Sequence, residues 1–353
     1  MTKNLIMMFG ALLMTPSLMA NEPMVITTWN IEHLGSPGRG FGGGFGGFGR
    51  YATPPRMDQL PKRTDEQLKK IADLISTDLM SDIIAIQEVA VTHKRRHRSL
   101  CKPLDQIVSH LESAKEKGDW AYHIPYVDEV PELDDEKNMH LGFMWNRKRV
   151  KLVKVFEMSM RDQKLAGKEL FERAPLLGYF EEVRSDGSPG LDFVVVNVHL
   201  ASGQQHDENH LIAMTLIEYG ITRDLARHAI SEPSVIIMGD FNENPNRKDA
   251  SGKALTSPAL TAHMQFKGYK YLTKPEMQFT RLNNHLTSMI DHILVNKSAQ
   301  AHIIEPKATI YRPGSGPLGD KKIFPQWRAT YSDHLPISFK IKSSKDNDSD
   351  FFD

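Results

Sequence analysis

The chain has 353 residues, of which 40% are hydrophobic, 25% charged and 8% aromatic. These fractions are typical of a soluble globular protein and exclude extensive disorder, a collagen-like repeat and a polytopic membrane protein. Because 44 basic residues balance 44 acidic ones, no overall field attracts a polyanion, and nucleic-acid affinity has to come from local patches. The single cysteine, Cys101, excludes an internal disulfide and any metal site that needs several cysteines.

The first twenty residues have the layout of a secretory signal peptide. Lys3 gives a positive start, residues 5–13 form an apolar run, Pro16 breaks it, and Ala20 offers a small residue for cleavage. The apolar run is too short to span a bilayer well. We therefore expect residues 1–20 to be removed and the mature protein to be secreted or periplasmic in a bacterium. The alternative is a buried N-terminal helix.

A glycine-rich segment follows the first expected strand, residues 24–29. Residues 35–50 are so rich in glycine that ordering them would cost much conformational entropy, so we expect a flexible insertion. Its aromatic and basic side chains could instead form a flap over nucleic acid. These side chains are Arg39, Phe41, Phe45, Phe48 and Arg50.

Apolar periodicity predicts the remaining elements. One helix is expected over residues 64–79, with Thr64 as its N-cap, and another over residues 210–229. Short apolar runs predict strands at residues 82–87, 193–198, 235–238, 290–295 and 336–341. No linker divides the chain, so residues 21–342 are expected to form one domain, and the acidic tail 343–353 is expected to fray.

A run of basic residues follows the strand predicted at residues 82–87. Residues 93–102 contain no acid. The cations are Lys94, Arg95, Arg96, Arg98 and Lys102. Such a run is commonly a solvated loop, but this one follows a strand end with a candidate catalytic carboxylate. Contact with phosphate is therefore an equal alternative.

Several predicted strands end in a carboxylate, an amide or an imidazole where the strand meets a loop. A single ending of this kind has little meaning, because Asp and Asn favour turns and caps. A set of such endings at one edge of a sheet is different, because polar groups can converge there. The residues are Asn30, Glu88, His199, Asp240, Asn242, Asp291, Asp333 and His334.

The chemistry of this set indicates hydrolysis of a phosphate ester with a divalent cation. The carboxylates of Glu88 and Asp333 are hard oxygen ligands suited to Mg²⁺ or Mn²⁺, as are the neutral amides in the set. His334 is the natural base, and Asp291 could accept its other ring proton. No phosphate-binding loop of the GxxxxGK[ST] type, HExxH motif, GxSxG elbow or EF-hand loop competes with this interpretation.

In their order along the chain, the motifs resemble those of the endonuclease/exonuclease/phosphatase superfamily, the metal-dependent phosphoesterases that include DNase I-like nucleases. Each motif is short, but the resemblance covers about residues 24–342, essentially the whole mature chain. The motifs are Thr28-Trp-Asn-Ile31, Gln87-Glu88, Asn197-Val-His199, Gly239-Asp-Phe-Asn242, Ile290-Asp291 and Ser332-Asp-His-Leu-Pro336. The resemblance implies an α/β fold, a four-layer sandwich of two packed, mostly antiparallel β-sheets flanked by helices.

The resemblance also implies a role for each carboxylate and amide. Glu88 would be the principal metal ligand, helped by Asn30 and Asp333. Asp240 and Asn242 would position the attacking water and the scissile phosphate. The metal, Mg²⁺ or Mn²⁺, and the number of ions stay open.

For the histidines, the resemblance implies that His334, oriented by Asp291, acts as a base or as a phosphate-stabilising acid. His199 would face it across the phosphate. Arg173 matches a position at which DNase I-like and secreted bacterial nucleases place an arginine that can grip a phosphate. The alternative is an ordinary surface arginine.

Other polar residues near the motifs are expected to have structural or outer positions. His292 follows Asp291 directly, so on a strand its side chain points to the opposite face. Glu32 and Glu243 are expected to lie behind the ligands or to face solvent, and nothing in the resemblance assigns a role to His33 or His210.

Three features favour nucleic acid as the substrate, and the expected export fits a DNase. The stretch His199-Leu-Ala-Ser-Gly203 resembles one in secreted bacterial nucleases, Arg173 matches the nuclease position, and both the basic run and the glycine–phenylalanine segment follow site residues. The balanced charge argues for modest, salt-dependent binding. DNA against RNA and endo- against exonuclease action stay open.

The alternative substrate is a phospholipid headgroup, as for a sphingomyelinase-like phosphodiesterase. That enzyme needs an exposed aromatic hairpin, and the only candidates lie in the flexible residues 35–50, so no stable membrane association is expected. A third alternative is a binding protein on an inactive scaffold. We expect a monomer, although Cys101 could either be buried or pair between chains.

Overall fold

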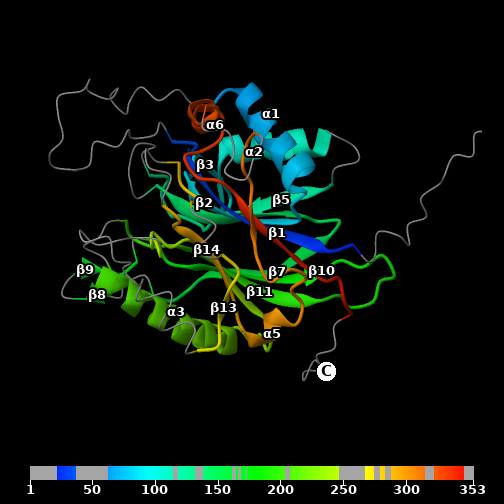
Figure 1. The fold of residues 1–353 in the computed structure, drawn as a ribbon, viewed down its shortest axis with the longest axis vertical. Helices are drawn as coiled ribbons and strands as arrows, with labels where there is room; N and C mark the ends of the chain where they lie inside the picture. Colours follow the sequence, from blue (N-terminus) through cyan, green and yellow to red (C-terminus); the bar gives the residue numbers. More distant parts are fainter. Residues whose placement is uncertain are drawn as a thin grey trace, which may run out of the picture.

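Two six-stranded sheets packed face to face make up the centre of the computed structural model (Figure 1). The structure describes residues 22–36, 63–113, 118–131, 138–160, 164–165, 168–171, 173–202, 207–245, 267–273, 279–282, 288–314 and 322–345. The expected signal peptide, all but the first two residues of the glycine-rich segment and most of the tail lie outside these ranges. The expectations for those segments therefore stay predictions.

The first sheet has the strand order β15–β16–β1–β2–β6–β5. Its strands are β1 (Met24–Leu34), β2 (Ile83–Val89), β5 (Trp120–His123), β6 (His140–Asn146), β15 (Thr309–Ile310) and β16 (Ile337–Ile341). Within it, β1 and β2 are parallel and the other pairs are antiparallel. β1 and β2 therefore direct their carboxyl ends to the same edge.

The second sheet repeats this arrangement, with the order β13–β14–β12–β11–β10–β7. Its strands are β7 (Val150–Glu157), β10 (Leu176–Glu182), β11 (Asp192–His199), β12 (Val235–Asp240), β13 (Lys270–Tyr271) and β14 (Asp291–Val295). Here β11 and β12 form the parallel pair. The predicted sandwich of two mostly antiparallel sheets is confirmed.

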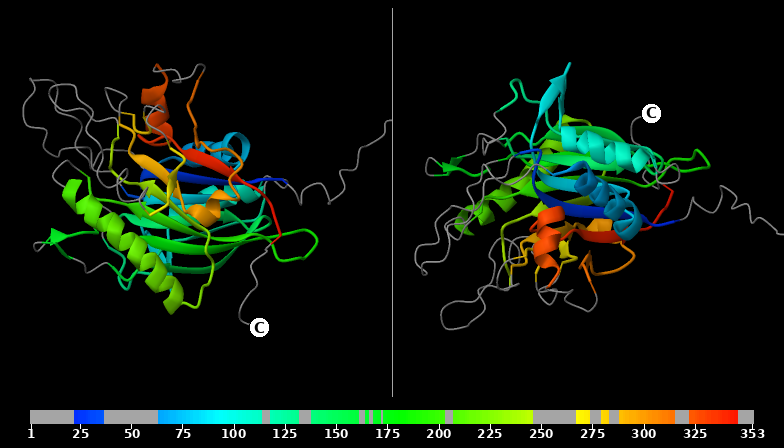
Figure 2. Two further views of the ribbon diagram at one scale, coloured as in Figure 1. Left: turned by 60° about the horizontal axis from the view of Figure 1, so that its bottom comes forward. Right: turned by 90° about the horizontal axis from the view of Figure 1, so that it is seen from above.

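Helices cover the outer face of each sheet (Figures 1 and 2). The first sheet carries α1 (Asp65–Asp73), the π-helical turn η3 (Leu74–Leu79) and α2 (Lys102–Ser113). The second carries α3 (Asp207–Arg227) and the short helix α5 (Lys297–Gln300), which contacts β12 and β14; the short helix α6 (Phe324–Thr330) lies next to α1. No helix in the described ranges is long and apolar enough to cross a membrane.

Large side chains fill the space between the two sheets. Phe143 of the first sheet meets Phe180 of the second edge-on, with ring centroids 5.3 Å apart, and Phe193 stacks next to Phe180 at 6.1 Å. All three are at most 1% exposed. A second apolar cluster lies between the second sheet and α3, where Val196 and Ile237 contact the helix residues Met214 and Ile217.

The N-cap predicted for the first helix is present. Thr64 and Gln67 form a capping box, in which each side chain accepts from the other residue's backbone N–H. The predicted single helix over residues 64–79 is instead α1 followed by the π-helical turn η3, which ends at Met80 in the left-handed conformation (φ 48°).

Two further findings differ from the sequence-based expectations. The basic run, expected as a loop, forms a hairpin of β3 (His93–Arg95) and β4 (Arg98–Leu100). Strands β5, β6, β7 and β10 were not predicted. The β8 (Lys164–Leu165) and β9 (Lys168–Glu169) pair is a second small hairpin. Of the alternatives for Cys101, the structure shows burial, since the residue is 0% exposed.

Candidate active site

Strand pairing gathers the predicted site residues at one edge of the sandwich. In the second sheet His199, Asp240 and Asp291 form one row, because His199 pairs with Asp240 and Asp240 pairs with Asp291 across β11, β12 and β14. In the first sheet Asn30 pairs with the residue directly before Glu88. The two parallel pairs thus bring their polar carboxyl ends to the same place.

Gly239 makes the close approach of β11 and β12 possible. Its φ of +143° is unfavourable for residues with a side chain, and a Cβ there would collide with the carbonyl oxygen of Val198. His199 and Asp240 are the residues that follow Val198 and Gly239. Any larger residue at position 239 would therefore displace the two side chains next to it.

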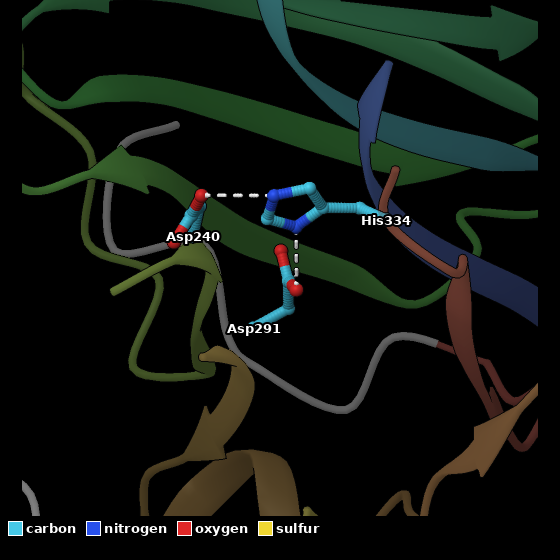
Figure 3. Close-up of side chains that lie close together, drawn as sticks. All are labelled: Asp240, Asp291 and His334. Carbon is cyan, nitrogen blue, oxygen red and sulfur yellow. Dashed lines mark hydrogen bonds and ion pairs between the residues drawn. The ribbon is translucent and has the colours of Figure 1, made fainter. Parts of the chain in front are cut away.

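His334 and Asp291 form a buried hydrogen-bonded pair (Figure 3). The Nδ1–H of His334 donates to Asp291 Oδ2 at 2.8 Å, and Nε2 on the other side of the ring faces Asp240 Oδ2 at 3.8 Å. Burial alone would disfavour the charged ring, but the carboxylates of Asp291 and Asp333 raise the pKa of His334 to about 10. At neutral pH this imidazole is a charged donor.

Asn30 bridges the two sheets between carboxylates. Its Nδ2 donates to Glu88 Oε1 at 2.8 Å and to Asp240 Oδ2 at 3.0 Å, while its Oδ1 accepts from the N–H of Glu32 at 3.0 Å. Reversing the amide would place an oxygen against two carboxylates and a donor against an N–H, so these contacts fix its orientation. The amide therefore holds two like charges close together.

His199 differs from His334 although the two rings flank the same carboxylate. Its Nε2 lies 3.6 Å from Asp240 Oδ2 and 3.9 Å from Glu88 Oε1, and its Nδ1 is buried without a hydrogen-bond partner among the described residues. Burial, reinforced by the charge of Arg173, lowers the pKa of His199 well below its ordinary value. One neutral and one charged imidazole therefore face the site.

Asp333 lies between cations rather than next to Glu88. Its Oδ2 accepts from Arg281 Nε at 3.1 Å and lies 3.8 Å from Arg328 Nη2, and its Oδ1 is 3.7 Å from His334 Nε2. Burial would raise its pKa, but the charges of His334 and the two arginines outweigh burial and lower it. Asp333 therefore stays ionised.

The donor chemistry of the site fits a divalent cation. Burial and the neighbouring charge of Asp291 raise the pKa of Asp240 to about 7, and a cation close by would offset both effects. Ligand atoms of Asp240, Asp291 and His334 lie within 4.8 Å of one another. His334 and Asp291 are hydrogen-bonded to each other, and Asp240 Oδ2 lies between the two imidazoles, so the carboxylate of Glu88 is the better candidate for holding a cation.

Two of the predicted residues lie at the rim. Arg173 donates from Nε to the carbonyl oxygen of Met139 at 2.7 Å, and its charge acts on His199. Asn242 has a left-handed backbone (φ 51°); its N–H donates to Asp240 Oδ1 at 2.9 Å, and its Nδ2 donates to the carbonyl of Leu200 at 2.7 Å. All nine residues singled out from the sequence are thus at or next to one site.

The residues expected to be structural are buried in a network behind the site. His292 donates to the carbonyl of Glu243 at 2.8 Å and accepts from Thr273 at 3.0 Å, facing away from the row of Asp291. Glu243 does not face solvent: it is 5% exposed and hydrogen-bonds His210 Nδ1 at 2.8 Å. His210 Nε2 donates to the carbonyl of Ala201, close to the catalytic edge.

Several residues that shape the site carried no sequence signal. Arg281 and Arg328 lie in short segments that match no motif. Glu32 connects Arg328 with the backbone of Asp333, because it accepts from Arg328 Nη2 and from the N–H of Asp333, both at 2.9 Å. Arg63 donates to three carbonyls, those of Ile31, Glu32 and Tyr331. These contacts attach the end of β1 to the loop that carries His334.

Comparisons with known proteins agree with this fold. The sequence pattern of the Endonuclease/Exonuclease/phosphatase family matches residues 27–334. No curated protein matches the sequence significantly. Solved structures with the same fold include the human nocturnin catalytic domain with bound sulfate, which is 13% identical with a TM-score of 0.51 and 91% of this chain and 95% of that chain covered.

Two bacterial structures are similar to the same degree. An endonuclease/exonuclease/phosphatase family protein from Bacteroides thetaiotaomicron is 12% identical, with a TM-score of 0.52; the match covers 93% of this chain and 100% of that chain. An endonuclease/exonuclease/phosphatase from Bacteroides vulgatus is 14% identical, with a TM-score of 0.52; the match covers 92% of this chain and 100% of that chain. These identities show the fold alone. The family pattern covers most of the chain, which therefore belongs to the endonuclease/exonuclease/phosphatase family of hydrolytic phosphoesterases.

Proposed function

We propose that this phosphoesterase is a secreted, Mg²⁺- or Mn²⁺-dependent nuclease that hydrolyses phosphodiester bonds, with DNA as its main substrate. The observation that carries the proposal is the buried His334–Asp291 pair, with Nε2 of the ring facing Asp240, a carboxylate that Asn30 joins to Glu88. This arrangement offers a charged donor and a carboxylate to a phosphate group placed at the edge of the sheets.

His334 is the donor in this mechanism. Its Nδ1 is committed to Asp291, which fixes the ring, so Nε2–H is the group that reaches a phosphoryl oxygen or the leaving oxygen. With a pKa raised to about 10, the ring carries its proton throughout the neutral range. It stabilises the negative charge that develops during attack.

Asp240 is the acceptor. Its pKa of about 7 suits a general base at neutral pH, and its Oδ2 is within 4 Å of both imidazoles. Asn30 and the N–H of Asn242 hold the carboxylate in place. A divalent cation held by Glu88 and its neighbours would supply charge neutralisation for the phosphate.

The choice of DNA and of export rests on sequence features. The stretch 199–203 and Arg173 favour a nuclease, and the structure places Arg173 close enough to His199 for its charge to act on that ring. An arginine there can grip a phosphate oxygen that the histidines do not reach. Residues 1–20 support secretion or a periplasmic location.

The test is cleavage of supercoiled plasmid at low salt by residues 21–353, with Mg²⁺, with Mn²⁺ or with EDTA. We expect nicking that needs the metal and that falls by about 10²–10⁴-fold in His334→Ala, as for the loss of a general acid. His110→Ala removes an imidazole on α2, outside the site, and keeps the activity. Intact plasmid would contradict the DNase proposal, and RNA and sphingomyelin would then be assayed with the same variants.

A further inference from the structure

The β3–β4 hairpin stands out from the body of the molecule shortly after β2, the strand that carries Glu88 at its carboxyl end, and is cyan in the right-hand view of Figure 2. Arg95 and Arg98 pair across the hairpin, and Arg96 lies in its turn with a left-handed backbone (φ 56°). All three side chains are exposed. The hairpin thus presents three guanidinium groups to solvent.

These three arginines have no acidic partner among the residues that the structure describes. Other exposed cations do: Arg147, directly after β6, pairs with Asp119, and Lys151 on β7 of the second sheet pairs with Glu181 at 2.9 Å. An exposed cation without a carboxylate keeps its full charge available for an external anion. The hairpin is therefore a local basic patch on a chain whose net charge is zero.

A small hollow with aromatic and cationic walls lies between the turn and second strand of the hairpin and the end of β5. The hollow holds about 30 Å³, and His97, Arg98, His123 and Tyr126 are among its lining residues. Tyr126 is 45% exposed, lies 6.4 Å from the ring of His97 and has the Lys94 ammonium 5.3 Å from its centroid. An exposed ring flanked by cations suits a nucleobase next to its phosphates.

Strand register places this hollow on the catalytic edge. β5 runs in the same direction as β2, because both are antiparallel to β6. His123 pairs with Phe143, and Phe143 pairs with Ala85, three residues before Glu88. Tyr126, three residues after His123, therefore continues toward the same edge, two strand spacings or roughly 10 Å to the side.

We propose that the β3–β4 hairpin binds the sugar-phosphate backbone of a nucleic-acid strand beside the cleaved bond, with Tyr126 against a base. The inference rests on the proposed nuclease function and adds the segment that selects long polyanionic substrates. A strand that continues past Glu88 would meet the hairpin within a few nucleotides, because duplex DNA carries a charge about every 1.7 Å along its axis.

The acidic residues that follow Tyr126 in the sequence would compete with DNA for the hairpin arginines. The sequence from 128 to 136 contains six acidic residues, of which Asp128 and Glu129 are described. Neither carboxylate forms an ion pair with the hairpin arginines; only the backbone carbonyl of Asp128 takes part, accepting from Lys94. If the acidic stretch neutralised the hairpin in solution, removing the arginines would leave DNA binding unchanged.

The experiment measures binding of a short fluorescent duplex by anisotropy, in an Asp240→Asn background with Mg²⁺ so that the duplex stays intact. The test variant is Arg95→Gln/Arg96→Gln/Arg98→Gln. The matched control removes three exposed lysines at the opposite edge, where β6 and β16 end. It is Lys148→Gln/Lys340→Gln/Lys342→Gln.

We expect the hairpin variant to bind at least about tenfold more weakly and the slope of log K against log[salt] to become shallower by about 2 to 3, at roughly 0.9 per phosphate contact. The control and the charge-retaining Arg→Lys triple variant should bind like the background protein. All variants should share one unfolding midpoint.

Equal binding by the hairpin and background proteins, or equal losses in the hairpin and control variants, would overturn the inference. Plasmid cleavage by the wild-type chain reports on the proposed function separately. A protein that cuts plasmid but binds duplex without the hairpin would refute only the inference; one that cuts no nucleic acid would refute the proposed function.

Discussion

Removing the negative charge of Asp291 should lower two pKa values at once. The rise in the pKa of His334 from 6.5 to about 10 corresponds to about 5 kcal/mol of preference for the charged ring, at about 1.4 kcal/mol per pKa unit. Asp291 is the first of the carboxylates that produce this rise, and its charge also raises the pKa of Asp240. In Asp291→Asn, both groups should therefore titrate at lower pH.

The consequence for activity follows from the same contacts. With a neutral amide beside Nδ1, His334 loses the partner that fixes its ring and holds its proton, so the rate should fall by about 10²–10⁴-fold and the alkaline limb of the pH–rate profile should move to lower pH. Histidine NMR titration of metal-free protein and pH–rate profiles on a small chromogenic phosphodiester measure the two effects.

Asp186→Asn is the matched control, since Asp186 is exposed in the turn between β10 and β11, at the end of β11 opposite to His199. It should leave the titration of His334 unchanged. A His334 ring that titrates at the same pH in Asp291→Asn and in the wild type would refute the assignment of the charge to this pair.

Three other changes test the packing and the supports of the site. Burial and a hydrogen bond to Asp192 raise the pKa of the buried Glu232 carboxyl. Its contribution to stability is therefore present below the unfolded pKa and is lost as pH rises through the folded pKa. In urea titrations between pH 5 and 9, Glu232→Gln should lose less stability than the wild type, and parallel curves for the two proteins would contradict this. Phe180→Ala should lower the free energy of unfolding by about 3–5 kcal/mol because it leaves a cavity between the sheets. A loss under about 1 kcal/mol would mean that neighbouring side chains close this cavity. Arg63→Met leaves three carbonyls without their donor, so kcat on a small diester should fall more than KM rises; equal kinetics would show that the loop holding His334 is fixed by other contacts.

The architecture was predictable because the strands that carry it are continuous apolar runs. Residues 193–198 and 235–238 contain only buried apolar and amide side chains, and each was predicted within two residues of its observed end. β6 and β10 were missed because Gly142 and Gly178 interrupt their patterns where neighbouring side chains or backbone need the space of a Cβ. Glycine in a strand reads as a break unless the packing is known.

The candidate site could be predicted where it depends on strand ends and could not where it depends on tertiary contacts. His199 and Asp240 follow from the sequence because each terminates a buried strand. Arg281 and Arg328 do not, because they come from segments that only the fold brings to Asp333. The basic run was mistaken for a loop because charged side chains hide the two-residue turn at Arg96 and His97 that pairs its strands.

The most direct test of the central claim is the steady-state hydrolysis of a small chromogenic phosphodiester by Asp240→Asn. Such a substrate needs neither DNA binding nor the hairpin, so it reports on the residues at the edge of the sheets alone. We expect a metal-dependent rate that falls by about 10²–10⁴-fold in Asp240→Asn and is unchanged in Asp186→Asn. Equal rates for Asp240→Asn and the wild type would contradict it.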